Sequence, residues 1–80
     1  MLTALILINV EKGKIHNVAE EISQLEEVVE VYSIAGPYDL MAKVQVNEYE
    51  AFNEIIPDKL QKIDGIKSTQ TLMAFKAYKF

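Results

Sequence analysis

The chain has 80 residues, which is the length of one domain, and a domain this short buries only about 60–65% of the surface that its unfolded chain exposes. Half of the residues are hydrophobic and a quarter are charged, which excludes a disordered chain, and the absence of cysteine excludes disulfides and thiolate metal sites. Twelve acidic residues stand against eight lysines, arginine is absent and the net charge is −4, so we expect no direct contact with nucleic acid.

The first expected element is a buried strand from Leu2 to Asn9. This run is rich in Leu and Ile, is apolar on both faces, and is followed by a polar segment that extends to Lys14. The opening letters MLTALILINV lack the basic region and the cleavage site of a signal peptide, and they are too few to span a bilayer. We therefore expect a cytoplasmic protein with no membrane segment.

An amphipathic helix is expected next, at roughly Gly13 to Glu26, with its acidic residues outside the apolar stripe. The residues of this stripe recur at helical spacing and are Ile15, Val18, Ala19, Ile22 and Leu25.

Two strands are predicted after this helix, Val28 to Ala35 and Tyr38 to Val46. Successive side chains of the second strand point alternately to the two faces of the sheet. Gly36-Pro37 joins the two strands.

The second helix is predicted to begin with a capping box, in which Asn47 is the N-cap and Glu50 lies three residues later. Its apolar face comprises Phe52, Ile55, Ile56, Leu60 and Ile63. Pro57 lies within this pattern, where it removes a hydrogen bond and predicts a kink or a break. We expect Gly65 to stop the helix. A last strand, rich in Thr and aromatic residues, is predicted from Lys67 to Tyr78.

The predicted order of elements is strand, helix, strand, strand, helix, strand, which is the ferredoxin-like βαββαβ arrangement. The expected fold is therefore α+β, with a four-stranded antiparallel sheet in a single domain over residues 1–80. Right-handed crossovers place both helices on one face of the sheet and leave the other face open. The first and last strands are apolar on both faces, so a monomer would expose an apolar patch. We expect a second copy to bury this patch, as in a dimeric α+β barrel.

Catalytic and metal-binding templates are absent from the sequence. His16 is the only histidine, and the helical wheel places it away from the apolar stripe, on the side of Glu20 and Ser23. Acidic residues gather between Glu20 and Glu30, but a cation site needs several converging oxygen ligands, so a solvated charged face is the simpler interpretation. We expect no enzyme activity, no catalytic residue, no cofactor and no metal.

The stretch GPYD, Gly36 to Asp39, lies where the second predicted strand passes into the third. Its simplest interpretation is a tight turn, since Pro fits the first central position and Gly tolerates unusual dihedral angles. Tyr38 and Asp39 are not residues that turn geometry requires. Tyr38 is bulky for a turn in solvent, and Asp39 opens an apolar strand, where a carboxylate needs a partner.

These residues carry a resemblance to a known family. The string VVEVYSIAGPYDLMAKVQV, followed after a helix by GIKSTQTLMAF, resembles the ligand-binding or RAM domain of the Lrp/AsnC transcription regulators. The family patterns are a valine-rich strand that ends in a G-x-Y-D-L turn, and a later G-[IV]-x-x-T-x-T strand. Here they correspond to Gly36–Leu40 and Gly65–Thr71, and the likeness covers essentially the whole chain.

The resemblance implies a function and an assembly. Domains of this family pair through their sheet faces, the dimers form a ring that is commonly an octamer, and small molecules, usually amino acids, bind between dimers. Full regulators carry an additional N-terminal helix-turn-helix, which is missing here. The chain thus looks like a stand-alone RAM domain, an amino-acid-binding effector and oligomerisation domain without DNA binding of its own. Its expected partners are an amino acid, other copies of the chain, and a full-length Lrp/AsnC regulator.

The resemblance also implies the ligand-binding residues. They are Gly36, Tyr38 and Asp39 of the turn, and Ser68, Thr69, Gln70 and Thr71 of the last strand. Gly36 permits nearby amides to hold a carboxylate, and Asp39 suits an ammonium group. Pro37 has no amide hydrogen and removes one donor from this cradle. Because arginine is absent, no bidentate arginine clamp can hold the ligand carboxylate.

Two alternatives to the sensor remain open. Dimeric ferredoxin-like units also host small cofactor-free enzymes, which would need a pocket between helices and sheet with His16 pointing inward as a base. A purely structural assembly module would use the turn only to support the ring. Loss of ligand binding with an intact oligomer in Asp39→Ala favours the sensor, whereas collapse to dimers favours the assembly module.

Overall fold

The computed structural model describes residues 1–80. Its elements are, in chain order, strand β1 (Leu2–Val10), helix α1 (Ile15–Ser23), strands β2 (Val28–Ser33) and β3 (Leu40–Val46), helix α2 (Ala51–Glu54), a π-helix η1 (Ile55–Leu60) and strand β4 (Ile66–Ala74). The predicted βαββαβ order is confirmed. No helix is long and apolar enough to cross a membrane.

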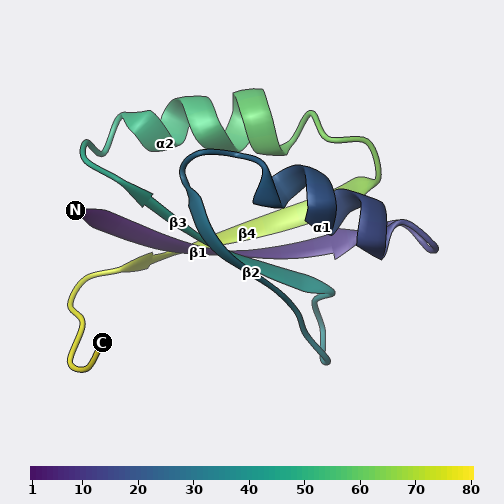
Figure 1. The fold of residues 1–80 in the computed structure, drawn as a ribbon, viewed down its shortest axis with the longest axis horizontal. Helices are drawn as coiled ribbons and strands as arrows, with labels where there is room; N and C mark the ends of the chain where they lie inside the picture. Colours follow the sequence, from purple (N-terminus) through teal and green to yellow (C-terminus); the bar gives the residue numbers. More distant parts are fainter.

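The four strands form one antiparallel sheet with the order β2-β3-β1-β4. Both helical segments cover the same face of this sheet, and no helix covers the opposite face (Figure 1). The predicted α+β, ferredoxin-like fold is therefore confirmed. β1 and β3 lie in the centre of the sheet, whereas β2 and β4 form its two edges.

The hydrophobic core lies between the sheet and the helices. The strands contribute alternate residues to it, because successive side chains of a strand point to opposite faces. The core residues are Ala4, Ile6, Ile8 and Val10 of β1, Leu40, Ala42, Val44 and Val46 of β3, Val18 and Ile22 of α1, Phe52 of α2, and Ile55 and Leu60 of η1. No polar or charged residue is buried among them.

The open face of the sheet carries the other side chains of the same strands. The register places Leu5 opposite Leu72, Leu7 opposite Met41, and Met41 opposite Tyr32. Leu72 and Tyr32 are exposed in the single chain, and the other three are partly exposed. The expected apolar patch is present, and its burial by a second copy stays a prediction.

The start of the second helix differs from the prediction. α2 begins at Ala51 after Glu50, and no side chain caps it, so the predicted capping box at Asn47 is wrong. Residues 48–50 form a turn whose carbonyl oxygens accept the amides of residues 51–53 at 3.0–3.1 Å. These backbone bonds satisfy the donors that a capping side chain would otherwise serve.

The predicted break at Pro57 is confirmed. Regular α-helical geometry ends at Glu54, and the chain continues as the π-helix η1 (Ile55–Leu60). Gln61 N donates to Ile56 O at 2.9 Å, a bond to the fifth residue back that is typical of a π-helix. Because Pro57 has no amide hydrogen, the ladder of an α-helix is interrupted at this point.

Gly65 does not end the helix as predicted, because η1 already ends at Leu60. It lies in the turn before β4 with a φ of +102°. A Cβ atom on Gly65 would lie 2.9 Å from Lys14 Cδ and 3.0 Å from Val18 Cγ2. The glycine therefore lets this turn pack against the start of α1, where Gly65 O also accepts a hydrogen bond from Glu11 N at 2.7 Å.

Several elements are shorter than predicted. β2 ends at Ser33 rather than Ala35, and β3 begins at Leu40 rather than Tyr38. β4 stops at Ala74 rather than Tyr78, because Ala74 lies opposite Thr3 and the partner strand β1 has only one further residue, Leu2. α1 spans Ile15–Ser23, so it is also shorter than the predicted helix at both ends. The last six residues of the chain lie outside the sheet.

Candidate functional site

The predicted GPYD turn forms the tip of the β2–β3 hairpin, which projects from the sheet at the lower right of Figure 1. Ile34 N donates to Asp39 O at 3.0 Å and closes a loop that contains Gly36 and Pro37. Gly36 has a φ of +130°, a region that favours glycine, and nothing lies within 4 Å of the position that a Cβ atom would occupy. The space beside Gly36 is therefore open to a ligand or to a neighbouring subunit.

Asp39 finds its partners in β1. Its amide donates to Ile8 O at 2.9 Å, and its Oδ2 atom accepts a hydrogen bond from Val10 N at 2.9 Å. The pairing of β3 with β1 ends at Leu40 opposite Ile8, so the Asp39 side chain supplies the next acceptor in place of a backbone carbonyl. This partly buried contact explains how a carboxylate is accommodated next to an otherwise apolar strand.

Tyr38 connects the two predicted motifs. Its hydroxyl donates a hydrogen bond to Gln70 Oε1, although 32 residues separate them in the sequence. Gln70 lies opposite Leu7, and Ser68 lies opposite Asn9, so both of these β4 residues are on the open face. Predicted residues of the turn and of β4 therefore meet at one corner of the open face.

Thr69 and Thr71 lie on the other face of β4. They are opposite Ile8 and Ile6, whose side chains are buried under the helices. Thr69 Oγ1 accepts a hydrogen bond from Gln61 Nε2 at 3.2 Å. Thr71 lines a hollow of about 340 Å³ beside the second helix, together with Tyr49, Phe52, Asn53, Ile56, Pro57 and Met73. The structure thus divides the four predicted β4 residues between two faces of the sheet.

Two further residues at this corner, Val10 and Asn9, carry no recognisable motif in the sequence. Val10 N holds the Asp39 carboxylate, and Asn9 lies beside Ser68 on the open face. Both come at the end of an apolar run, and the sequence contains no signal for partners 29 or more residues away. Only the polar side chain of Asn9, which closes that run, indicates that the strand ends at a solvent-facing corner.

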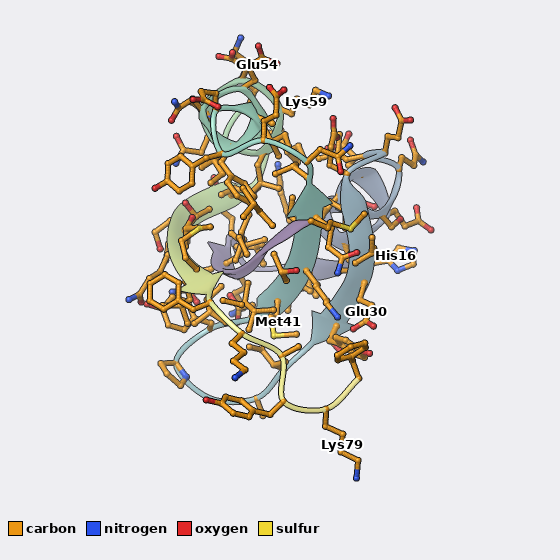
Figure 2. All side chains as sticks on the ribbon, turned by 90° about the vertical axis from the view of Figure 1, so that its left-hand side faces the viewer. His16, Glu30, Met41, Glu54, Lys59 and Lys79 are labelled. Atoms are coloured by element: carbon orange, nitrogen blue, oxygen red, sulfur yellow. The ribbon has the colours of Figure 1, made fainter.

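His16 lies away from this corner and points outward from α1 (Figure 2). Its Nε2 atom is 3.1 Å from Glu20 Oε1, and the His16 side chain is 82% exposed. The predicted solvent-side position is confirmed. The inward-pointing base that the enzyme alternative requires is therefore not formed by this histidine.

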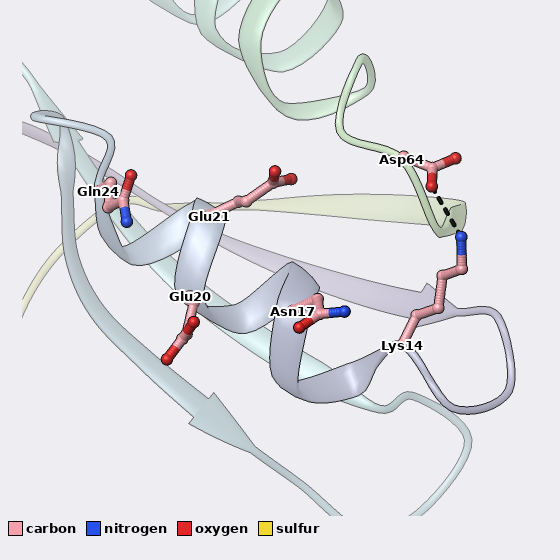
Figure 3. Close-up of a pocket in the computed structure, with 6 residues that line it drawn as sticks. All are labelled: Lys14, Asn17, Glu20, Glu21, Gln24 and Asp64. Atoms are coloured by element: carbon pink, nitrogen blue, oxygen red, sulfur yellow. Dashed lines mark hydrogen bonds and ion pairs between the residues drawn. The ribbon is translucent and has the colours of Figure 1, made fainter.

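A separate polar hollow of about 310 Å³ lies between α1 and the turn before β4 (Figure 3). Lys14 Nζ and Asp64 Oδ2 are 2.7 Å apart at its edge, whereas the carboxylates of Glu20 and Glu21 point in different directions. The hydrogen bond from Lys14 lowers the pKa of the Asp64 carboxyl and raises the pKa of the Lys14 ammonium. This hollow contains none of the predicted site residues, so it does not extend the candidate site.

Known regulators are similar in sequence to this chain. Residues 3–80 match the family model described as the Lrp/AsnC ligand binding domain. The HTH-type transcriptional regulator FL11 of Pyrococcus furiosus is 36% identical over 76 residues, which are 95% of this chain and 50% of that protein. The chain spans about half the length of the curated relatives it matches.

Solved structures share its fold. TTHA0845 from Thermus thermophilus is 36% identical and aligns over 100% of both chains with a TM-score of 0.93. The transcriptional regulator NMB0573 of Neisseria meningitidis, solved as a complex with L-Met, aligns over 99% of this chain and 53% of that chain with a TM-score of 0.85 and 22% identity. Because the family model matches nearly every residue, the chain belongs to the Lrp/AsnC ligand-binding domain family.

Proposed function

We propose that the chain is a non-enzymatic sensor domain that binds an amino acid at the corner where the β2–β3 turn meets β4. The observation that carries the proposal is the hydrogen bond from Tyr38 to Gln70, which joins two motifs far apart in the sequence. The family description supports a small-molecule ligand. The Neisseria regulator, which shares the fold, was solved with L-Met, so amino acids are the first class of ligand to test.

An ammonium group matches the free side of Asp39. Its Oδ2 atom is engaged with Val10 N, whereas Oδ1 accepts no hydrogen bond from the chain. An ammonium that donates to Oδ1 would form a charge-assisted hydrogen bond, which is stronger than a neutral one. The contact with Val10 holds the carboxylate in place before the ligand arrives, so less side-chain entropy is lost on binding.

The backbone amides of the turn match a carboxylate. Asp39 N already donates to Ile8 O, and Pro37 has no amide hydrogen, so the available donors are the amides of Gly36 and Tyr38. The open space beside Gly36 permits a ligand to approach these amides closely. The turn therefore offers opposite charges to the two ends of an amino acid.

The corner forms only one wall of a binding site in the single chain. Gly36, Ser68 and Gln70 are exposed, and Tyr38 and Asp39 are half-buried. A second subunit that covers this end of the open face would exclude water and strengthen the charged contacts. We therefore place the ligand where subunits of neighbouring dimers meet, in a ring such as an octamer that is built from homodimers paired through their open faces. A full-length Lrp/AsnC regulator is a further partner in this proposal.

Thr69 and Thr71 stay predicted ligand residues. They face the helix side of the sheet, so in this proposal they contact a ligand that a different subunit holds at its own turn. Thr71 is the better placed of the two, because it lines the hollow beside α2 and η1, whereas the Thr69 hydroxyl already accepts a hydrogen bond from Gln61.

A thermal-shift screen against the twenty amino acids tests the proposal. Binding to the folded state raises the melting temperature by an amount that grows with the ratio of ligand concentration to Kd. We expect at least one amino acid to stabilise the protein and Asp39→Asn to remove that stabilisation. The absence of a shift with all of them, for a well-folded oligomer, would contradict the proposal.

The structural assembly module is the second candidate, and the bond between Asp39 and Val10 N favours it. This bond gives the carboxylate a task that needs no ligand. Asp39→Asn separates the two candidates, because an amide oxygen still accepts from Val10 N while the charge is lost. Loss of ligand binding with an unchanged oligomer supports the sensor, and unchanged behaviour of Asp39→Asn with disassembly of Asp39→Ala supports the assembly module.

A further inference from the structure

The hollow beside the second helix has a mostly apolar lining. It lies between Phe52 and Ile56 of the helical segments and Thr71 and Met73 of β4, and we call it the helix-side hollow. Its volume is about 340 Å³. Small-molecule sites are concave, mostly apolar and about 300–1,000 Å³ in volume, so this hollow has the size for a small ligand or for the side chain of one.

The walls of the helix-side hollow combine a fixed part with an adaptable part. Phe52 is 5% exposed, and its ring meets the Tyr49 ring edge-on at a centroid distance of 6.1 Å. Ile56 and Met73 are only partly buried, so an apolar group that enters the hollow removes more of their surface from water. The flexible side chain of Met73 adapts to the shape of such a group. Entry of an apolar group is therefore favourable.

The helix-side hollow offers no partner to a charged group. Its polar side chains are Tyr49, Asn53 and Thr71, and all three are neutral. Glu54 follows Asn53 in the chain, but its side chain points away from the sheet, on the outer side of the helix (Figure 2). An ionised group would lose water in the hollow without gaining an opposite charge, which is costly. The hollow thus selects against acidic and basic side chains.

The helix-side hollow and the turn of the same chain lie on opposite sides of β4. Gln70, which holds Tyr38 of the turn, faces the open side, whereas Thr71 and Met73 lie opposite Ile6 and Ala4 of the core. One subunit therefore cannot bring its own turn to its own hollow. Because β4 is an edge strand, a neighbouring subunit can approach the hollow along the free edge of the sheet.

We propose that the helix-side hollow receives the side chain of the amino acid whose charged ends lie at the turn of a neighbouring subunit, and that it selects an amino acid with an apolar side chain. This inference rests on the sensor function proposed above and names the class of its ligand. One subunit recognises the ammonium and carboxylate groups, and the other recognises the side chain. Asn53 is the specificity-determining residue of the hollow, because its neutral amide occupies a position where a carboxylate would attract cationic side chains.

A series of ligands tests the size and polarity of the selected side chain. Calorimetric titration of the wild-type oligomer compares alanine, 2-aminobutyrate, norvaline and norleucine, whose side chains grow by one carbon atom at a time. We expect the Kd to fall about fourfold with each added carbon, as for a methylene that is buried on binding. Lysine is norleucine with an ammonium group at the end of the side chain, and we expect it to bind at least about tenfold more weakly than norleucine.

A nearly isosteric substitution tests the role of Asn53. Asn53→Asp places one carboxylate in the hollow, and because Asn53 is exposed the fold should tolerate the change, which circular dichroism verifies. We expect the ratio of the lysine Kd to the norleucine Kd to fall by about tenfold or more, because the new carboxylate forms a charge-assisted hydrogen bond with the lysine ammonium. Asn17→Asp makes the same change at an exposed position of α1 outside the hollow, and as the matched control it should leave this ratio unchanged.

The outcomes separate this inference from the sensor function. Tightest binding by a charged amino acid, an affinity that does not depend on side-chain length, or an equal ratio of the two Kd values in wild type and Asn53→Asp would each overturn the inference and leave the sensor function standing. The absence of binding by every amino acid, in a well-folded oligomer, would overturn both. Tighter binding of the longer apolar side chains together with a lower ratio in Asn53→Asp alone is the result that supports it.

Discussion

The carboxylate of Asp39 accepts a hydrogen bond from the backbone amide of Val10 at 2.9 Å, across 29 residues of sequence. This contact fixes the GPYD turn to the end of β1, next to the edge strand β4 that pairs with it. It gives Asp39 two tasks in our account, because Oδ2 holds the turn while Oδ1 stays free for a ligand. Substitutions at Asp39 separate these tasks.

Removal of the Asp39 side chain is expected to destabilise the fold. Asp39→Ala leaves the partly buried amide of Val10 without an acceptor, which costs about 1–3 kcal/mol of unfolding free energy. Asp39→Asn keeps an acceptor and is expected to lose less than half as much. Urea denaturation of both variants measures the difference, and equal losses would show that the Val10 contact contributes nothing.

Removal of the Tyr38 hydroxyl is expected to weaken ligand binding more than the fold. The exposed hydrogen bond to Gln70 contributes about 0.5–1.5 kcal/mol, so Tyr38→Phe should weaken ligand affinity about 2- to 13-fold through a less fixed corner. Tyr78→Phe is the matched control, because the Tyr78 ring is exposed and lies after the end of β4, outside the corner. A calorimetric titration in which both variants bind equally well would contradict the role given to Tyr38.

Gly65 is expected to be the least replaceable glycine. Gly65→Ala combines a positive φ with a Cβ atom 2.9 Å from Lys14 Cδ, and such strain costs about 1–3 kcal/mol of unfolding free energy. Gly13 also has a positive φ, but a Cβ atom at this position would meet open space. Gly13→Ala therefore measures the cost of the backbone strain without the cost of the side-chain contact. Gly65→Ala should have a lower melting temperature than Gly13→Ala. The opposite order would show that the residues of α1 near Gly65 move aside without cost.

The ion pair between Glu27 and Lys59 is expected to contribute to the acid stability of the protein. Their Oε2 and Nζ atoms are 2.8 Å apart, and the hydrogen bond from Lys59 lowers the pKa of the Glu27 carboxyl. A carboxyl with a lowered pKa in the folded state stabilises the fold fully above its unfolded value of about 4.3, and this contribution is lost as the pH falls through the folded value.

Glu27→Gln should therefore lower the unfolding free energy at neutral pH by less than Asp39→Ala does, and should flatten its decrease below about pH 4.3. Glu48→Gln removes an exposed carboxylate that forms no ion pair and serves as the control. Urea denaturation between neutral and acidic pH measures both slopes, and parallel curves for wild type and Glu27→Gln would exclude the proposed linkage.

The fold could be predicted from the sequence because its signals are local. The alternation of apolar residues in β3 and the helical spacing around Val18 and Ile22 identify elements that the buried core confirms. The ends of helices and strands are harder to predict, because they depend on the strands and backbone groups with which each end forms hydrogen bonds. β4 stops at Ala74 because β1 runs out of residues to pair with, and the capping box at Asn47 is replaced by backbone bonds of a turn.

The candidate site could be predicted only as two separate motifs. The letters GPYD and GIKSTQT identify residues, but the contact between Tyr38 and Gln70 depends on the order of strands in the sheet and on the register of β1 with β4. For the same reason the sequence does not reveal Val10 as the partner of Asp39. Ser68 and Thr69 lie on opposite faces of the sheet because successive side chains of a strand point to opposite sides. A sequence motif does not show which face each residue takes.

Isothermal titration of the oligomer with the amino acid that gives the largest thermal shift tests the central claim most directly, with wild type and Asp39→Asn measured side by side. Hydrogen bonds to charged groups contribute about 1.5–3 kcal/mol, so the account predicts saturable binding to wild type and about 10- to 150-fold weaker binding to Asp39→Asn in an oligomer of unchanged size. Equal affinity of the two proteins for the amino acid would contradict the assignment of Asp39 to the ammonium group, and no binding to wild type by any of the twenty would contradict the sensor itself.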